Sequence, residues 1–278
     1  MVRLWYVLML LLSLCGCQSA EPPPKHLLIC GSRVLLPVLR AIAERFESQH
    51  PNVRIDFDAG LSNQGARDTR EGLADVGMLM REIRTEETGL VSHFLGRDAL
   101  VFIVHRDNPL SSIRQEQAVE LYSQSYSSWK ELGGPDVPVT VVGLTEGRAA
   151  RTQLNDFLKL EPMWAKPTLA VSTHQQIVQA VADRPGAIGC VSLMATLRQL
   201  AEGREDRLER QPIRVLPLAG VMPSSETITT YKYPFVRPAV LVTRPSSSEC
   251  VRQFVEFALS PDQHDLLRRH GLAPLSSR

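Results

Sequence analysis

The feature that most constrains the fold is an alternation of two hydrophobic patterns along the chain. Short runs of apolar, often β-branched residues predict buried strands, as at 27–30 and 99–105. Between such runs, apolar residues recur every three or four positions, which predicts amphipathic helices, as at 35–46. Repeated β-α-β units favour parallel strands with helices on both faces. We therefore expect an α/β protein built from mostly parallel sheets flanked by helices.

Two breaks in this alternation divide the chain. The first lies near Asn108-Pro109 and the second at residues 231–237, and the piece that follows is too short for a core of its own. We expect it to pack onto the first piece, so that the chain crosses twice between two lobes. Ligands of open α/β sheets bind beyond the carboxyl ends of the strands, and domain clefts favour pockets. Lobe 1 is predicted to hold residues 26–107 plus 237–278, and lobe 2 residues 108–236.

The first 25 residues are typical of targeting sequence. Arg3 precedes an apolar run, Leu4–Leu14, which is too short to span a membrane and favours a secretory signal peptide. The run ends in L-C-G-C, which resembles the bacterial lipobox and predicts removal of residues 1–16 and lipidation of Cys17. Residues 17–25, with three consecutive prolines, predict an extended tether. The alternatives are an ordinary signal peptide or an uncleaved anchor.

Composition and charge exclude several classes of function. Hydrophobic residues make up 44% of the chain and charged residues 22%, as in ordinary globular proteins. The net charge is +1, and loss of Arg3 with the signal would leave none, so nothing favours nucleic acid as a partner. Cys30, Cys190 and Cys250 would remain, and an odd number is no complete disulfide framework. We expect a monomer held outside the cytoplasm by its lipid.

No pattern indicates catalysis, a cofactor or a bound metal. The sequence has no G-x-S-x-G, no H-E-x-x-H and no Walker A loop. His264 and His270 are six residues apart on one predicted helix, so their side chains point in different directions. We expect a binding protein without catalytic residues, cofactor or metal ligands.

The stretch T-E-G-R-A-A-R-T, residues 145–152, lies between a predicted strand and a predicted helix. Such a turn aims backbone N–H groups and the positive end of a helix dipole at the space before it, which favours an anion. A tight anion cradle usually needs small residues, however, and Arg148 stands in the middle of this turn. The loops at 31–33, 60–65 and 78–81 are expected at the same edge of the fold.

Several stretches resemble the phosphate-binding proteins of bacterial phosphate ABC transporters. G-S-R-V-L-L-P, followed by A-E-R-F-E-S-Q-H-P-N-V, resembles the family's first strand, loop and helix, and S-W-K-E-L-G-G-P-D-V-P-V-T-V-V-G resembles the entry to its second lobe. G-A-I-G-C-V-S and Y-P-F-V-R-P resemble two later segments, so the match runs in order along nearly the whole mature chain. The resemblance implies a type II, two-lobed periplasmic binding protein that captures phosphate or a related small oxyanion for an ABC permease.

The family holds its anion with hydroxyl side chains and backbone N–H groups, and this chain keeps few of the hydroxyls. Arg33 stands at a threonine position, Leu79 and Met80 replace a hydroxyl or acidic pair, and the E-G-S-G-T-R motif becomes E-G-R-A-A-R. The family arginine three residues before that glycine is Leu144 here. The candidate ligand-binding residues are Ser32, Arg33, Val34, Ser62, Asn63, Gly65, Met80, Gly147, Arg148, Ala149, Ala150 and Arg151.

Three interpretations of the added arginines stay open. In one, Arg33 and Arg148 give forked, charge-assisted hydrogen bonds to an oxyanion, without which they would repel each other. In a second, their stems fill the ligand's volume, and the fold serves as a sensor or assembly partner whose phosphate site is lost or re-specified. A third, purely structural alternative pairs Arg148 with Glu146 at the surface. The lost hydroxyl donors predict weaker phosphate binding than the family's.

Overall fold

The computed structural model describes residues 25–146, 148–160, 167–196 and 212–274. The strands are β1 (Lys25–Ser32), β2 (Val53–Gly60), β3 (Val76–Leu79), β4 (Val91–His105), β5 (Thr140–Leu144), β6 (Leu169–Val171), β7 (Ala187–Ser192), β8 (Ile213–Val215) and β9 (Val236–Thr243). The helices are α2 (Leu36–Gln49), α3 (Ser62–Glu71), α4 (Gln115–Tyr122), α5 (Ala149–Leu158), α6 (His174–Ala182), α8 (Ser225–Thr229), α9 (Glu249–Leu259) and α10 (His264–Arg269), with 3₁₀ turns at Trp129–Leu132 and Pro261–Gln263.

The strands form one continuous mixed sheet. Their order is β2-β1-β3-β9-β4-β7-β5-β6, and β8 pairs with β4. At the two ends of this path the strands are parallel, because β1 pairs with β2 and β3, and β5 pairs with β6 and β7. In the middle, β4 and β9 run antiparallel to each other and to their other neighbours. The expected two-lobed α/β fold is confirmed. The sheet differs from the expected mostly parallel arrangement in its centre, where β4 and β9 are antiparallel to all their neighbours.

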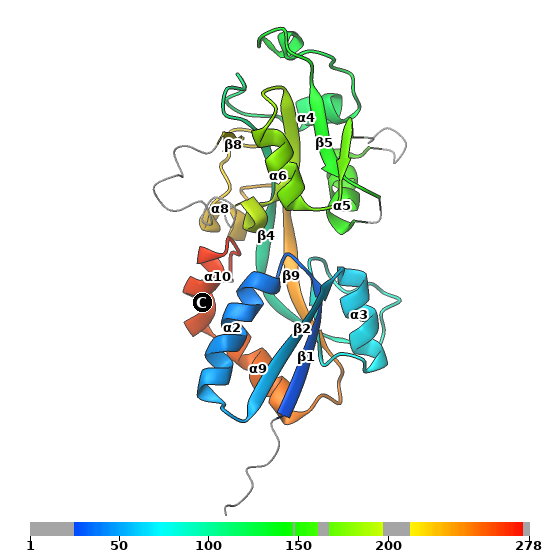
Figure 1. Cartoon of the computed structure of the whole chain (residues 1–278), viewed down its shortest axis with the longest axis vertical. Helices are drawn as coiled ribbons and strands as arrows, with labels where there is room; N and C mark the ends of the chain where they lie inside the picture. Colours follow the sequence, from blue (N-terminus) through cyan, green and yellow to red (C-terminus); the bar gives the residue numbers. More distant parts are fainter. Residues whose placement is uncertain (1–24, 147, 161–166, 197–211, 275–278) are drawn as a thin grey trace, which may run out of the picture.

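Two long strands join the lobes. Figure 1 shows β4 and β9 side by side, running from the lower lobe with α2, α3 and α9 to the upper lobe with α4, α5 and α6. The first part of β4 pairs with β9, whereas its last part pairs with β7 and β8. Both strands therefore belong to the two lobes at once, and the backbone crosses between the lobes in extended conformation.

Each lobe has its own large cluster of buried hydrophobic side chains. One large cluster of buried side chains is drawn from residues 99–235 together with Ala273, and includes Phe102 and Trp129. The second is drawn from residues 27–95, 239–272 and Met194, and includes Phe46 and Phe254, whose rings meet edge to face. The lobe boundaries at 107/108 and 236/237 stay a prediction.

Some predicted elements begin elsewhere. The strand expected at 99–105 starts at Val91, because the preceding residues pair with β9. The loop expected at 60–65 is short, because α3 already starts at Ser62. Gly65 was expected to belong to that loop, but it lies in α3. It lets the helix approach β1, because a Cβ at this position would lie 2.9 Å from the carbonyl oxygen of Cys30. The three described cysteines are free and buried, and part of the helix expected at 193–202 lies outside the described residues.

A buried ion pair ties the two crossing strands together. Asp98 of β4 and Arg237 of β9 are register partners, and Nε and Nη2 of Arg237 lie 2.9 and 2.8 Å from Oδ2 of Asp98. Side-chain exposure is 0% for Asp98 and 4% for Arg237. Burial raises the pKa of the Asp98 carboxyl, and the charge of Arg237 opposes that rise. The hydroxyl of Ser192 also donates to Asp98, at 2.8 Å, which brings β7 into the same network.

We expect Asp98→Ala to lower the free energy of unfolding by about 3–5 kcal/mol, because it leaves the Arg237 charge buried without its partner. Urea denaturation of both proteins measures the difference. The matched control is Asp107→Ala, whose carboxylate is exposed just after β4 and lies 3.6 Å from Nδ1 of His105; it should change stability by less than about 0.5 kcal/mol. Equal midpoints for wild type and Asp98→Ala would contradict this account.

Candidate functional site

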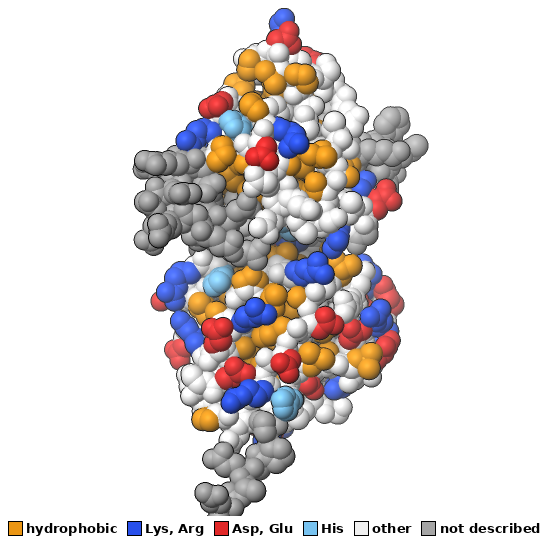
Figure 2. Space-filling model, viewed as in Figure 1, with side chains coloured by type: hydrophobic (Ala, Val, Ile, Leu, Met, Phe, Trp, Pro, Cys, Tyr) orange, Lys and Arg blue, Asp and Glu red, His pale blue; other side chains and the backbone are white. Residues whose placement is uncertain are grey.

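A cavity of about 940 Å³ lies where the strand-to-helix loops of the two lobes face each other. The lower lobe contributes the segments after β1, β2 and β3, and the upper lobe contributes the starts of α5 and α6. Figure 2 shows Lys and Arg side chains gathered at the waist between the lobes on the face in view. Among the described residues that line the cavity, five are arginines and one, Asp156, is a carboxylate.

Most predicted site residues meet in this cavity. They are Ser32, Arg33, Val34, Ser62, Asn63, Met80, Arg148, Ala149 and Ala150. Gly65 and Arg151 are absent from its lining, and Gly147 and Cys17 lie outside the described residues. The cavity thus joins residues from both lobes that are over a hundred positions apart in the sequence.

Gly65 and Arg151 serve other purposes in the structure. Gly65 packs α3 against β1 and β3, because a Cβ there would lie 3.0 Å from the Cα of Gly31 and 3.2 Å from the carbonyl oxygen of Met78. Arg151 turns back on its own loop, where Nη1 donates to the carbonyl oxygen of Leu144 at 3.2 Å and Nη2 lies 3.6 Å from Glu146. The surface pairing considered for Glu146 and Arg148 is therefore wrong, since Glu146 faces Arg151.

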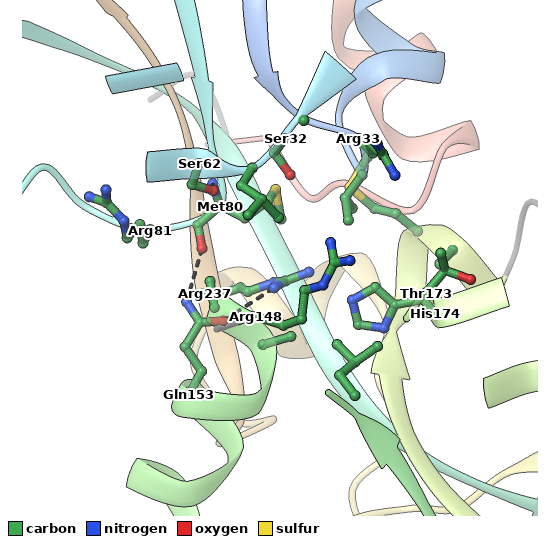
Figure 3. A pocket seen from close by; sticks show the side chains of 18 of the residues that line it. Ser32, Arg33, Ser62, Met80, Arg81, Arg148, Gln153, Thr173, His174 and Arg237 are labelled. Carbon is green, nitrogen blue, oxygen red and sulfur yellow. Dashed lines mark hydrogen bonds between the residues drawn. The ribbon is translucent and has the colours of Figure 1, made fainter. Parts of the chain in front are cut away.

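Arg148 points into the middle of the cavity. It is the residue that caps α5, with an extended backbone and no hydrogen bond from its side chain to the helix start. In Figure 3 its guanidinium extends from the upper lobe toward Met80 and Ser32 of the lower lobe, beside Arg237 and His174. Among the described residues, no carboxylate pairs with it. An unneutralised cation at a helix N-terminus, next to a second arginine, favours an anion in this space.

Three of the other four described arginines at the cavity are held by contacts within the protein. Arg33 is held at the mouth, where its Nε donates to the carbonyl oxygen of Ala59 at 3.0 Å. Arg81 forms a forked pair with Glu87, with contacts of 2.8 and 2.6 Å. Arg237 faces Asp98 and so brings little net charge to the cavity. Arg148 therefore differs from Arg81 and Arg237 in having no carboxylate partner among the described residues.

His174 lies beside the two central arginines and is uncharged at neutral pH. Burial, then the charges of Arg237 and Arg148, lower the pKa of its imidazole from 6.5 to about 3. Its Nδ1 accepts a hydrogen bond from the backbone N–H of Ser192 at 3.4 Å. The proton of the neutral ring then resides on Nε2, which is a hydrogen-bond donor.

Gln153 links the two lobes beside these groups. Its Nε2 donates to the carbonyl oxygen of Met80 at 2.9 Å, and its Oε1 accepts from Nη1 of Arg237 at 3.2 Å, as the dashed lines in Figure 3 mark. Helix α5 thereby contacts both the end of β3 and the crossing strand β9. One amide orients the buried arginine and joins the walls of the cavity.

The sequence prediction missed Gln153, Thr173, His174 and Arg237. Helical spacing could have found Gln153, because it stands four residues after Ala149 and so shares its face. Arg237 lies in Y-P-F-V-R-P, which the resemblance had already matched without assigning it a role. Thr173 and His174 open the helix α6, but no local pattern places that helix opposite Arg148.

A second cluster of polar side chains is held together by contacts within the protein. Potential ligand atoms of Cys30, Asp58 and Asp68 lie within 4.8 Å of one another. The thiol of Cys30 donates to Oδ2 of Asp68 at 3.4 Å, and burial and the neighbouring Asp68 raise the pKa of this thiol to about 12. Asp68 is already paired with Arg67 at 2.8 Å.

Comparison with known proteins gives a consistent result. A family described as the PBP superfamily domain matches residues 18–262. The chain is 22% identical over 253 residues to the phosphate-binding protein PstS of Borreliella burgdorferi, covering 87% of this chain and 88% of that one. It is 24% identical over 268 residues to PstS of Bacillus subtilis, covering 93% and 84%.

Solved structures agree with this match. A structure from Clostridium perfringens, described as a phosphate ABC transporter substrate-binding protein with bound phosphate, superposes with a TM-score of 0.79 at 25% identity, covering 91% of this chain and all of that one. An ABC-type phosphate transport receptor from Vibrio cholerae superposes with a TM-score of 0.72 at 21% identity, covering 90% of this chain and all of that one. This second match shows that the two proteins share a fold. The resemblance found in the sequence is confirmed. Across the described residues, no helix is long and apolar enough to cross a membrane.

We expect the stability of the protein to fall as the pH drops from 6.5 toward 3, partly because of His174. In the folded state the pKa of the His174 imidazole is lowered to about 3. Between pH 6.5 and 3 the imidazole is therefore protonated in the unfolded chain but not in the native state. This contributes a slope of at most about 1.4 kcal/mol per pH unit. His174→Gln should flatten the curve measured by urea denaturation between pH 4 and 8, whereas the exposed control His26→Gln should not. An imidazole titrating near pH 6.5 by NMR would contradict the assignment.

Proposed function

Because the chain belongs to the family of PBP superfamily domains, we propose that it is an extracytoplasmic receptor that captures phosphate or a related small oxyanion between its two lobes. The observation that carries this proposal is Arg148, whose guanidinium has no carboxylate partner among the described residues and points into a cavity that five described arginines and one described carboxylate line. The relatives named above as phosphate-binding proteins support the same ligand class.

The proposed binding mode uses both walls of the cavity. Arg148 and the N-terminus of α5 approach the anion from the upper lobe, and the hydroxyls of Ser32 and Ser62 approach it from the lower lobe. The lobes, proposed to comprise residues 26–107 plus 237–278 and residues 108–236, would close over the ligand by bending at β4 and β9. Gln153, which joins both walls, would hold the closed form.

The proposed location follows from the N-terminal sequence. A lipid on Cys17 and an extended tether over residues 17–25 would keep the receptor at a membrane surface outside the cytoplasm. The partner supported by the relatives is an ABC permease, to which the closed, monomeric receptor would deliver its anion. Globomycin-sensitive processing of the precursor, followed by mass spectrometry of the N-terminal peptide, tests the lipid on Cys17.

Arg148→Ala should weaken phosphate binding about tenfold to a hundredfold, because one charge-assisted hydrogen bond is worth roughly 1.5–3 kcal/mol. Titration calorimetry on the mature chain, kept in detergent and dialysed extensively, measures the dissociation constant. Arg70→Ala is the matched control, since this arginine lies on the exposed side of α3, next to Glu71.

The two alternatives give opposite results in this experiment. If the stem of Arg148 occupies the ligand's place, Arg148→Ala binds phosphate more tightly than wild type. If the fold serves only as a sensor or assembly partner without an anion site, neither protein binds phosphate, sulfate, molybdate or tungstate. Either outcome would contradict the proposed role of Arg148.

A further inference from the structure

Two hydroxyl groups at the cavity can donate hydrogen bonds to a ligand because each already accepts one from the backbone. The Oγ of Ser62 already accepts from the backbone N–H of Met80 at 3.1 Å, and the Oγ1 of Thr173 accepts from the backbone N–H of Gln176 at 3.1 Å. A hydroxyl that accepts from one side has its own proton available for another partner. Both residues line the cavity, so both can donate to a ligand there.

The acceptors around the cavity are largely used by the protein itself. Three lining carbonyl oxygens accept from side chains or backbone: that of Ala59 from Nε of Arg33, that of Gly60 from its N–H, and that of Met80 from Gln153. The side-chain oxygens of Asn63 and Gln153 accept from Arg81 and Arg237. These five oxygens of the lining residues are therefore already engaged within the protein before a ligand arrives.

The carboxylates do not change this pattern. Asp98 is fully buried and accepts from Arg237 and Ser192, so it cannot also serve a ligand. Asp156, the one carboxylate among the described lining residues, stands seven positions after Ala149, which is roughly 10 Å along α5 from the helix start. The Nε2–H of the neutral His174 adds a further donor near Arg148.

Tetrahedral oxyanions differ in whether they bring a proton. Between pH 6 and 8 phosphate carries one or two P–OH groups, each of which needs an acceptor, whereas sulfate carries none. A P–OH group that faces only donors loses its hydrogen bond, at a cost of about 1–3 kcal/mol when buried. The hydroxyl of Ser32 can accept one such hydrogen bond. A neutral acceptor, however, offsets less of the cost of burying the P–OH group than a carboxylate does.

We propose, on the basis of the receptor function above, that this cavity selects tetrahedral oxyanions that carry no proton, of which sulfate is the probe, over protonated phosphate. The donor set formed by Arg148, Ser62, Thr173 and His174, with the carboxylate of Asp156 roughly 10 Å along α5 from the helix start, produces this preference. The ligand class is thus defined by its protonation state as well as by its charge and shape.

Calorimetric titration of the full mature chain with sulfate and with phosphate, at pH 6, 7 and 8, tests the proposal. Sulfate should bind about tenfold more tightly than phosphate at pH 6. Phosphate affinity should rise toward pH 8 as its second proton leaves, while sulfate affinity stays level. The other titratable groups lining the cavity are Arg33, Arg81, Arg84, Arg148, Arg237, Asp156 and His270. Because the protein is the same in both titrations, any change in its own charge acts on both anions, and the ratio of the two affinities reports the proton on phosphate.

The outcomes separate the two proposals. Phosphate binding that is tighter than sulfate binding at every pH would overturn the selectivity and leave the receptor function intact. Binding of neither anion would overturn the receptor function and the selectivity with it. A preference for sulfate that narrows with rising pH supports both.

A designed acceptor provides an independent test. Met80 is buried beside Ser62, so Met80→Asp places a carboxylate among the donors, whereas Leu73→Asp adds the same carboxylate at an exposed position outside the cavity lining. Met80→Asp should move the phosphate-to-sulfate affinity ratio about tenfold or more toward phosphate, and Leu73→Asp should leave it unchanged. A folded Met80→Asp protein that binds sulfate with wild-type preference would contradict the proposal.

Discussion

The buried pair of Asp98 and Arg237 is the interaction on which the rest of the structure depends. It joins the two strands that cross between the lobes, and through Ser192 and Gln153 it reaches β7 of the upper lobe and helix α5. A buried charge is costly unless it is fully paired, so this network fixes where the strands cross and how α5 faces the lower lobe. The position of Arg148 in the cavity follows from that placement.

The network also determines the electrostatics of the site. Arg237 is paired with Asp98, and Arg81 with Glu87, whereas Arg148, which caps α5, has no carboxylate partner among the described residues. Around it stand hydroxyl, imidazole and amide groups whose hydrogen-bond acceptors are already engaged. A helix N-terminus and a free guanidinium attract an anion, and the surrounding donors define which kind of anion is stable there.

Much of the fold could be predicted from the sequence, because strand and helix periods are local properties. The helix at 174–182 begins and ends where the pattern placed it, and nine of the twelve candidate site residues line the cavity. What could not be predicted depends on partners far apart in the chain. Nothing near Gln153 indicates that it will reach Met80 and Arg237, and nothing near Gly65 distinguishes a ligand contact from close packing of α3 on β1.

The central claim is that an oxyanion binds between Arg148 and the loops of the lower lobe. A crystal structure of the protein grown with selenate, solved with the anomalous signal of selenium, tests it most directly. The account predicts one selenium peak with the oxygens of its anion within hydrogen-bond distance of the Arg148 guanidinium and the Ser62 hydroxyl. A guanidinium of Arg148 filling that position, with no selenium peak in the cavity at saturating selenate, would contradict it.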